Sequence, residues 1–238
     1  MTRPVQAWLR KQAVVIACLG ACAAPVKAQA QGPGSADIAR FFRSVQFDDA
    51  GTVRKMLAAT VNPNQINPVG GEPALVLALR EGSMTVFDTL MAQPGLDLET
   101  AAVNGNTALM MAAYQRNGRA VTALLARGAA VNRPGWSALH YAAAAGDDAI
   151  VAQLLEHGAA IDAPSPHASG KFTPLMMAAR EGHDRTVALL LEAGADVALK
   201  NSEGLDAAQI ALRADKPAIA ASIKARAGAG TNNATPAQ

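Results

Sequence analysis

The segment TPLMMAAREG at 173–182 is the clearest of four copies of a ten-residue pattern in this chain of 238 residues. The other copies are PALVLALREG at 73–82, TALMMAAYQR at 107–116 and SALHYAAAAG at 137–146. The leucines at the third position of these copies stand 34, 30 and 36 residues apart, which is typical of a structural repeat. The sequence therefore predicts an array of similar units.

A second pattern follows each of these leading leucines. An apolar residue recurs twelve residues on, and an apolar pair lies fifteen and sixteen residues on. The pairs are Leu90-Met91, Leu124-Leu125, Leu154-Leu155 and Leu190-Leu191. Apolar residues three or four apart lie on one face of a helix, so each unit is expected to contain a second helix. Three of these helices are expected to end at Gly128, Gly158 and Gly194.

Capping residues mark both ends of the first helix of a unit. A hydroxyl residue precedes it in three units, where its oxygen can accept a hydrogen bond from a free backbone N–H. These residues are Thr107, Ser137 and Thr173. Glycines seven residues after the leading leucines favour the left-handed conformation that ends a helix, and they are Gly82, Gly146 and Gly182. Two short helices cannot bury their own apolar face, whereas stacked pairs can, so we predict an all-α solenoid.

The composition agrees with this architecture. Hydrophobic residues make up 50% of the chain, and aromatic residues only 4%. The apolar share excludes a chain that is disordered throughout. The scarcity of aromatic residues indicates a core of alanine, leucine and valine, which suits close contacts between short helices.

The segments SALHYAA at 137–143 and TPLMMAA at 173–179 resemble the start of the ankyrin repeat, Thr-Pro-Leu-His-x-Ala-Ala. The stretches GAAVN at 128–132 and GADV at 194–197 resemble its end. The resemblance implies paired antiparallel helices with short β-hairpin fingers that project sideways. It also implies a non-enzymatic module that binds other proteins through its fingers and its concave helical face.

We expect the ankyrin-repeat domain to cover residues 36–227. Its six units are expected at about 36–67, 68–100, 101–133, 134–163, 164–201 and 202–227. The first and last units depart from the pattern and are predicted to cap the array, which a solenoid requires. Residues 31–35 are predicted to be a linker, and residues 228–238 a disordered tail.

Several departures from the pattern predict local differences between units. Pro73 replaces the capping threonine, and Arg116 replaces the glycine that ends the first helix. Arg116 should cost strain unless the turn is redrawn through Asn117-Gly118. The connection is short between Asn132 and Leu139 and long between Asp162 and Leu175. One finger is therefore expected to be clipped and the next one enlarged.

Residues 1–30 fit a cleaved secretory signal peptide. Basic residues come first, namely Arg3, Arg10 and Lys11. An uncharged stretch from Gln12 to Val26 follows, and small residues suited to signal peptidase occupy 26–30. The uncharged stretch is shorter than the roughly 20 residues that cross a membrane, so we expect no membrane span.

Cleavage would change the charge and remove the cysteines. Taking the four basic residues of this segment from the chain's 21 leaves 17 against 19 acidic residues, a net charge of −2, so no nucleic-acid partner is expected. Cys18 and Cys22 both lie in the segment, which excludes disulfides from a chain cleaved after it. LGAC at 19–22 also resembles a bacterial lipobox, which leaves lipidation of Cys22 as an alternative. We therefore expect a periplasmic or secreted protein, or else an outer-membrane lipoprotein. We also expect a monomer.

No residue pattern indicates an active site, a metal site or a cofactor. His140 stands at the histidine position of the ankyrin motif, where the resemblance implies hydrogen bonds to backbone groups between repeats. Asp147 and His183 occupy equivalent places in adjacent units, which favours a salt bridge or a solvent-exposed role over an acid–base pair. The alternative function is a haem or small-molecule binding protein that uses His140 with Met110-Met111 and Met176-Met177. Paired methionines are more often adaptable core residues.

The resemblance also places certain residues on the outward concave side. The predicted partner-binding residues are Tyr114, Trp136, Phe172, Arg80, Glu81, Gln115, Arg180 and Glu181. The small side chains of Ala144 and Ala145 are expected to leave a hollow among the aromatic residues. Aromatic side chains on a rigid surface often anchor an interface. Alternatively, Trp136 and Phe172 only cover their own hairpins while Tyr141 packs in the core.

Two kinds of partner fit an exported bacterial protein of this type. Some exported ankyrin proteins resemble helpers of catalase-type haem enzymes in oxidative defence. Others resemble immunity proteins that inhibit a toxic effector. No residue of this sequence distinguishes the two.

Overall fold

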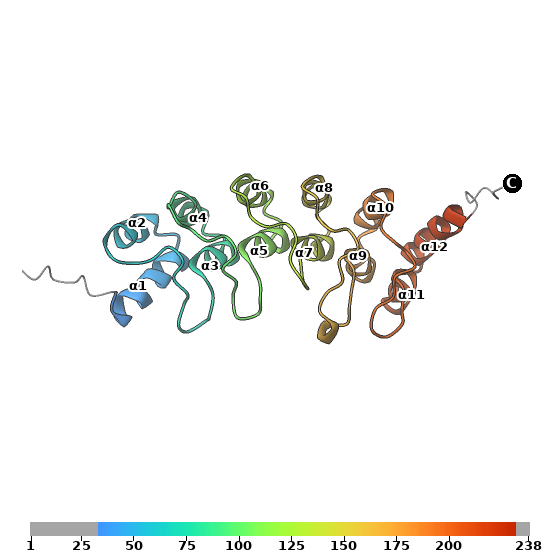
Figure 1. The fold of residues 1–238 in the computed structure, drawn as a ribbon, viewed down its shortest axis with the longest axis horizontal. Coiled ribbons are helices and arrows are strands. Elements are labelled where there is room, and N and C mark those ends of the chain that lie inside the picture. Colours follow the sequence, from blue (N-terminus) through green and yellow to red (C-terminus); the bar gives the residue numbers. More distant parts are fainter. Residues whose placement is uncertain (1–32, 232–238) are drawn as a thin grey trace, which may run out of the picture. The chain divides into compact units, whose positions relative to one another are not determined.

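The computed structural model of the chain describes residues 33–231, and it contains six pairs of α-helices (Figure 1). The first three pairs are α1 (Ser35–Gln46) and α2 (Ala50–Ala59), α3 (Ala74–Glu81) and α4 (Met84–Met91), and α5 (Ala108–Tyr114) and α6 (Gly118–Ala126). The other three are α7 (Ala138–Ala145) and α8 (Asp148–Glu156), α9 (Pro174–Glu181) and α10 (Asp184–Glu192), and α11 (Ala207–Arg213) and α12 (Pro217–Thr231). The predicted all-α solenoid is confirmed. The predicted signal peptide and residues 31–32 of the linker lie outside the described residues.

The first helices of the pairs pack side by side in sequence order, from α1 through α3, α5, α7 and α9 to α11. Helices α2, α4, α6, α8 and α10 form a second row, and loops project from the opposite side of the first helices (Figure 1). We call these loops fingers, and the surface made by the first helices and the fingers the finger face. Alanine pairs such as Ala142-Ala143 and Ala178-Ala179 are fully buried, which lets neighbouring first helices approach closely.

The repeating apolar residues form one continuous core within this array. The leading leucines Leu75, Leu109, Leu139 and Leu175 are at most 3% exposed. Leu90, Leu124, Leu154 and Leu190 of the second helices are fully buried. Each buried leucine contributes roughly 1.5–3 kcal/mol of hydrophobic free energy, so neighbouring units stabilise one another.

A residue with a positive φ angle separates the two helices of every pair. Gly82, Gly146 and Gly182 end their helices in the left-handed conformation, as predicted. Arg116 adopts the same conformation with φ of 55°, so the turn is not redrawn through the following residues. A side chain at such a φ angle costs roughly 1–2 kcal/mol, so this turn remains strained.

The fingers differ from the predicted β-hairpins. In the described part of the chain, the only β-type pairing is an isolated bridge between Ile66 and Pro73. Three other fingers are closed by isolated backbone hydrogen bonds, such as the one from the N–H of Ala102 to the carbonyl of Asn106 (2.9 Å), whereas none is present within the short finger at 130–136. So few paired residues do not make a ladder. The enlarged finger contains a single 3₁₀ turn, η1 (His167–Ser169).

The ends of the array also differ from the predicted boundaries. Helix α1 begins at Ser35, within the predicted linker, and α12 continues to Thr231, four residues into the predicted tail. The sequence from Pro217 to Ala227 is rich in alanine, the strongest helix former, but Gly228 and Gly230 are weak helix formers, so residue propensity does not explain these last four residues. Residues 232–238 of the predicted tail lie outside the described residues. Between 33 and 231, no helix is both long and apolar enough to cross a membrane.

Candidate partner-binding site

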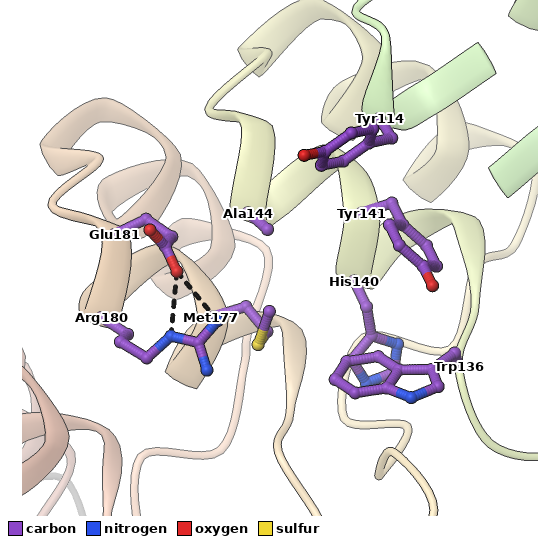
Figure 2. Close-up of a pocket in the computed structure, with 8 residues that line it drawn as sticks. All are labelled: Tyr114, Trp136, His140, Tyr141, Ala144, Met177, Arg180 and Glu181. Carbon is purple, nitrogen blue, oxygen red and sulfur yellow. Dashed lines mark hydrogen bonds and ion pairs between the residues drawn. The ribbon is translucent and has the colours of Figure 1, made fainter. Parts of the chain in front are cut away.

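A hollow of about 310 Å³ opens on the finger face between α7 and α9 (Figure 2). We call it the aromatic hollow. It is lined by Tyr114, Trp136, His140, Tyr141, Ala144, Met177, Arg180 and Glu181. These residues come from three successive units, because Tyr114 ends α5, Trp136 precedes α7, and Arg180 and Glu181 end α9. Its volume is at the lower end of the range for ligand pockets.

Small side chains create this space. Ala144 lies five residues after Leu139, and the equivalent residues of neighbouring units are Tyr114 and Arg180. Each of those long side chains lies at the edge of the hollow, whereas the methyl group of Ala144 leaves the middle open (Figure 2). The hollow therefore lies where the sequence predicts it.

Three aromatic rings form one wall of the hollow. The ring centroids of Tyr114 and Tyr141 are 6.0 Å apart with an interplanar angle of 84°. The Trp136 and Tyr141 centroids are also 6.0 Å apart, with ring planes tilted by 47°. The Tyr141 hydroxyl donates a hydrogen bond to Oδ1 of Asn106 (2.6 Å), and burial raises the pKa of Tyr141, so the hydroxyl stays protonated. These contacts hold the wall in place before any partner binds.

An ion pair forms the opposite wall. Nε of Arg180 donates to Oε1 of Glu181 at 2.9 Å, and Nη2 forms an ion pair with the same oxygen at 2.8 Å. The guanidinium carbon of Arg180 also lies 5.3 Å from the centroid of the Phe172 ring, within cation–π range. This wall therefore carries one positive and one negative group that neutralise each other.

Phe172 is buried, which corrects the prediction that it is an exposed anchor. Its side chain is only 9% exposed, and its ring covers Gly170 within the enlarged finger. Two hydrogen bonds fold this finger back: Phe172 N–H donates to Oγ of Ser165 (2.9 Å), and Ser165 N–H donates to the Phe172 carbonyl (2.8 Å). For Phe172, the structure matches the alternative that it covers its own finger.

Three other predicted residues lie outside the hollow. Arg80 forms ion pairs with Glu72 at 3.0 Å and with Glu81 at 2.8 Å. Nε2 of Gln115 donates to the carbonyl of Arg80 at 3.1 Å. The side chains of Arg80, Glu81 and Gln115 thus form a polar surface beside α3 and α5, away from the aromatic rings.

His140 links unit four to unit five from behind Trp136. Its side chain is fully buried, and its ring packs edge to face with the Trp136 ring at a centroid distance of 5.3 Å. Nδ1 accepts the N–H of Ser137 at 3.2 Å, so Nε2 carries the proton and donates to the Phe172 carbonyl at 3.0 Å. The expected hydrogen bond between repeats is present. Burial lowers the pKa of His140, which keeps the ring neutral.

The contacts of His140 weigh against the alternative of a haem site. Both ring nitrogens are engaged, and the paired methionines at 110–111 and 176–177 are each at most 9% exposed. A haem iron could reach His140 only after the core had been opened. The methionines fill the core, as adaptable apolar residues often do.

Of the two alternatives predicted for Asp147 and His183, the salt bridge between them does not form. Asp147 caps α8 by accepting the N–H of Ile150 at 3.1 Å, and it lies 3.6 Å from Nε of Arg116. His183 instead contacts the carbonyl of Ala144 through Nε2 at 2.9 Å. Helix capping thus removes this carboxylate from any acid–base pair.

Tyr141 is the residue of the hollow that sequence reasoning undervalued. It stands two residues after the leading leucine, where the other central units carry buried Leu77, Met111 and Met177. Those equivalents suggested a core role, but Tyr141 is half-buried and forms part of the aromatic wall. The signal that could have revealed this is its hydroxyl, which needs a polar partner near the surface.

Comparison with known proteins identifies the class of this repeat array. The family described as "Ankyrin repeats (3 copies)" matches residues 41–134 and 130–201, so the chain belongs to the ankyrin repeat family. It is 35% identical over 120 residues to "SH3 and multiple ankyrin repeat domains protein 1" of Homo sapiens, and equally to the proteins of that name from Mus musculus and Rattus norvegicus. These matches cover 49% of the chain but only 6% of the length of each relative. The ankyrin array is a protein–protein interaction module.

Proposed function

We propose that this protein is a non-enzymatic binding module of the bacterial periplasm that holds a partner protein on its finger face. The observation that carries the proposal is the aromatic hollow, in which 56%-exposed Tyr114 and half-buried Trp136 and Tyr141 surround an open space. Exposed aromatic side chains around a pocket are typical anchors of protein interfaces. The site is built from side chains of several units, so only a folded array can present it.

The rigidity of the hollow favours binding. Tyr141 is held by Asn106, Arg180 is held by Glu181, and the ring of Trp136 rests on that of His140. Few side chains must therefore become ordered when a partner binds, and little conformational entropy is lost.

The fingers extend the proposed binding surface. Val69 is 95% exposed and Val103 is 87% exposed, and both lie in fingers of the array. The N–H of Val103 donates to the carbonyl of Gly71 at 3.2 Å, which ties these two fingers together. Apolar side chains on linked fingers can contact a partner seated on the finger face.

Two partner classes remain candidates within this function. One is a catalase-type enzyme of oxidative defence, and the other is a toxic effector that the protein inhibits. Purified members of each class, encoded near the gene for this protein, can be tested directly for binding.

A photo-crosslinking experiment tests the proposed surface. The full chain carries a photoreactive amino acid in place of Tyr114, or in place of exposed Arg185 on α10 as the matched control. We expect one partner protein to be crosslinked from position 114 and not from position 185. Equal adducts from both positions, or none from position 114, would contradict the proposal.

The proposed export is tested by fractionation and mass spectrometry. Cleavage after Ala28 or Ala30 yields an unlipidated periplasmic protein, whereas lipidation yields a chain that begins at Cys22. A protein that is found in the cytoplasm with residues 1–30 still attached would refute the proposed export.

A further inference from the structure

Three aromatic side chains border the hollow, and aromatic rings can attract a positive charge. Tyr114 is nearly perpendicular to Tyr141, Trp136 is tilted against it, and adjacent ring centroids are 6.0 Å apart. The faces of aromatic rings are electron-rich, and they attract a cation that lies within about 6 Å of the ring centroid. An anion in the same place would be repelled by these faces.

The opposite wall has room for a hydrogen-bond donor. In the described part of the chain, the hydrogen bond from Arg180 goes to Oε1 of Glu181 and no hydrogen bond to Oε2 is present, so Oε2 can accept from a second donor. Figure 2 shows Glu181 at the edge of the hollow, across from the aromatic rings. Arg180 belongs to the same wall as Glu181, because it pairs with Glu181 and lies against the Phe172 ring. A cation in the hollow would therefore meet the aromatic side chains on one side and the Arg180–Glu181 pair on the other, where Oε2 of Glu181 can accept a hydrogen bond from it.

We propose that the aromatic hollow receives an arginine side chain of the partner protein, which stacks on the aromatic wall and donates to Oε2 of Glu181. This inference rests on the proposed function. A hollow of about 310 Å³ accommodates one long side chain more readily than a large ligand. Arginine fits better than lysine because its guanidinium is planar, is weakly hydrated and both stacks on rings and donates in a fixed fork.

A second Arg-Glu pair in the chain provides a matched control for the proposed arginine site. Arg80 and Glu81 form the same neighbouring ion pair in unit two, but Glu72 stands there at the position of Phe172. Neither Arg80 nor Glu81 lines the aromatic hollow. A site that recognises arginine by charge alone would use both pairs, whereas the proposed site uses only Glu181.

A fluorescence titration tests the proposal in the full chain. Trp8 is the only other tryptophan and lies in the segment that we propose is cleaved, so Trp8→Phe leaves Trp136 as the single indole reporter in both the uncleaved and the cleaved chain. The probes are acetylated Gly-Ser-Xaa-Ser-Gly amides in which Xaa is arginine, lysine, citrulline or glutamate. Titration extends to about 20 mM, because one side chain is expected to bind in the millimolar range.

We expect the arginine peptide to change the Trp136 emission with saturation. The citrulline and glutamate peptides should bind at least about tenfold more weakly, because citrulline keeps the shape of arginine but lacks its charge. Glu181→Gln should weaken arginine binding about tenfold, whereas Glu81→Gln should leave it unchanged. Ala144→Leu, which fills the hollow, should abolish the response while unfolding at the same temperature.

Other outcomes would overturn the inference. Preferred binding of the glutamate peptide would assign the hollow to an acidic side chain that pairs with Arg180. Equal binding of the citrulline or lysine peptide would show that the hollow does not select a guanidinium. No saturable response would exclude arginine from the hollow, yet crosslinking from position 114 would still test the proposed function separately.

Discussion

Units two and five present the same Arg-Glu pair at the end of their first helix, but they build different surfaces. In unit two, Arg80 lies between Glu72 and Glu81, and the result is a closed polar surface. In unit five, Phe172 replaces Glu72, and the preceding unit contributes Ala144 in place of a long side chain. The Arg180–Glu181 pair therefore borders a hollow. The same backbone therefore carries a polar surface in one unit and borders a hollow in another, depending on the side chains that its neighbours supply.

The largest expected effect separates buried Phe172 of unit five from exposed Tyr114 of unit three. Phe172→Ala should lower the free energy of unfolding by about 3–5 kcal/mol, because it removes a buried ring and leaves a cavity. Tyr114→Ala, at a 56%-exposed residue, should change it by less than about 0.5 kcal/mol. Urea unfolding of both variants measures the difference. Equal losses would mean that Tyr114 is structural.

The next effect concerns binding. Tyr114→Ala should weaken the affinity for the crosslinked partner by about 2 kcal/mol, or roughly thirtyfold, because it removes an aromatic anchor from the hollow. Gln115→Ala, which alters the adjacent polar surface, serves as the control and should leave affinity nearly unchanged. Calorimetry or a binding titration with the purified partner measures both. A larger loss from Gln115→Ala would move the interface toward unit two.

A pH effect should arise in unit four, since His140 occupies a place where unit five has Met176. Burial lowers the pKa of His140 below its usual 6.5, so below that pH the unfolded chain binds more protons than the folded one. The stability supplied by neutral His140 is present above pH 6.5 and falls by up to about 1.4 kcal/mol per pH unit below it, until the folded pKa is reached.

Urea unfolding between pH 7.5 and about 5 measures this dependence. His140→Asn should be less stable at the upper pH, and the slope due to this histidine should disappear. An unchanged slope in the variant would show that other groups cause the pH dependence.

The smallest expected effect lies in the turn between the helices of a pair. Arg116→Gly should stabilise the protein by about 1 kcal/mol, because glycine adopts the positive φ angle without strain. Gly146→Ala should destabilise it, since φ there is 68° and the added Cβ would lie 2.4 Å from Nδ1 of His183. Thermal unfolding measures both, and a lower melting temperature for Arg116→Gly would contradict the strain.

The repeat pattern predicted most of the fold because each of its features acts locally. The leading leucines, the capping hydroxyls and the glycines such as Gly146 each specify the state of one short segment. The fingers were harder to predict, because their conformation depends on single hydrogen bonds and on contacts with the next finger. The extension of α12 to Thr231 was also missed, because Gly228 and Gly230 are weak helix formers and favour an earlier helix end.

Only part of the candidate site could be predicted, namely the residues whose orientation follows from their position in the repeat. Tyr114, Trp136 and the space at Ala144 could be placed by position in the repeat, because first-helix residues at equivalent positions point the same way. Phe172 occupies the same repeat position as Trp136, yet the enlarged finger folds its ring inward. Tyr141 stands at a core position, yet its hydroxyl reaches Asn106 near the surface.

The amino-acid sequence alone determined the class of fold, the number of units and the place where small side chains interrupt a row of long ones. These properties depend on residues near one another in the chain and on a period that stacking reproduces. The tertiary structure alone decided which rings face the open space, which carboxylate oxygen is free and where Phe172 is buried. Those properties depend on contacts between units some thirty residues apart, and the local pattern of one unit does not encode them.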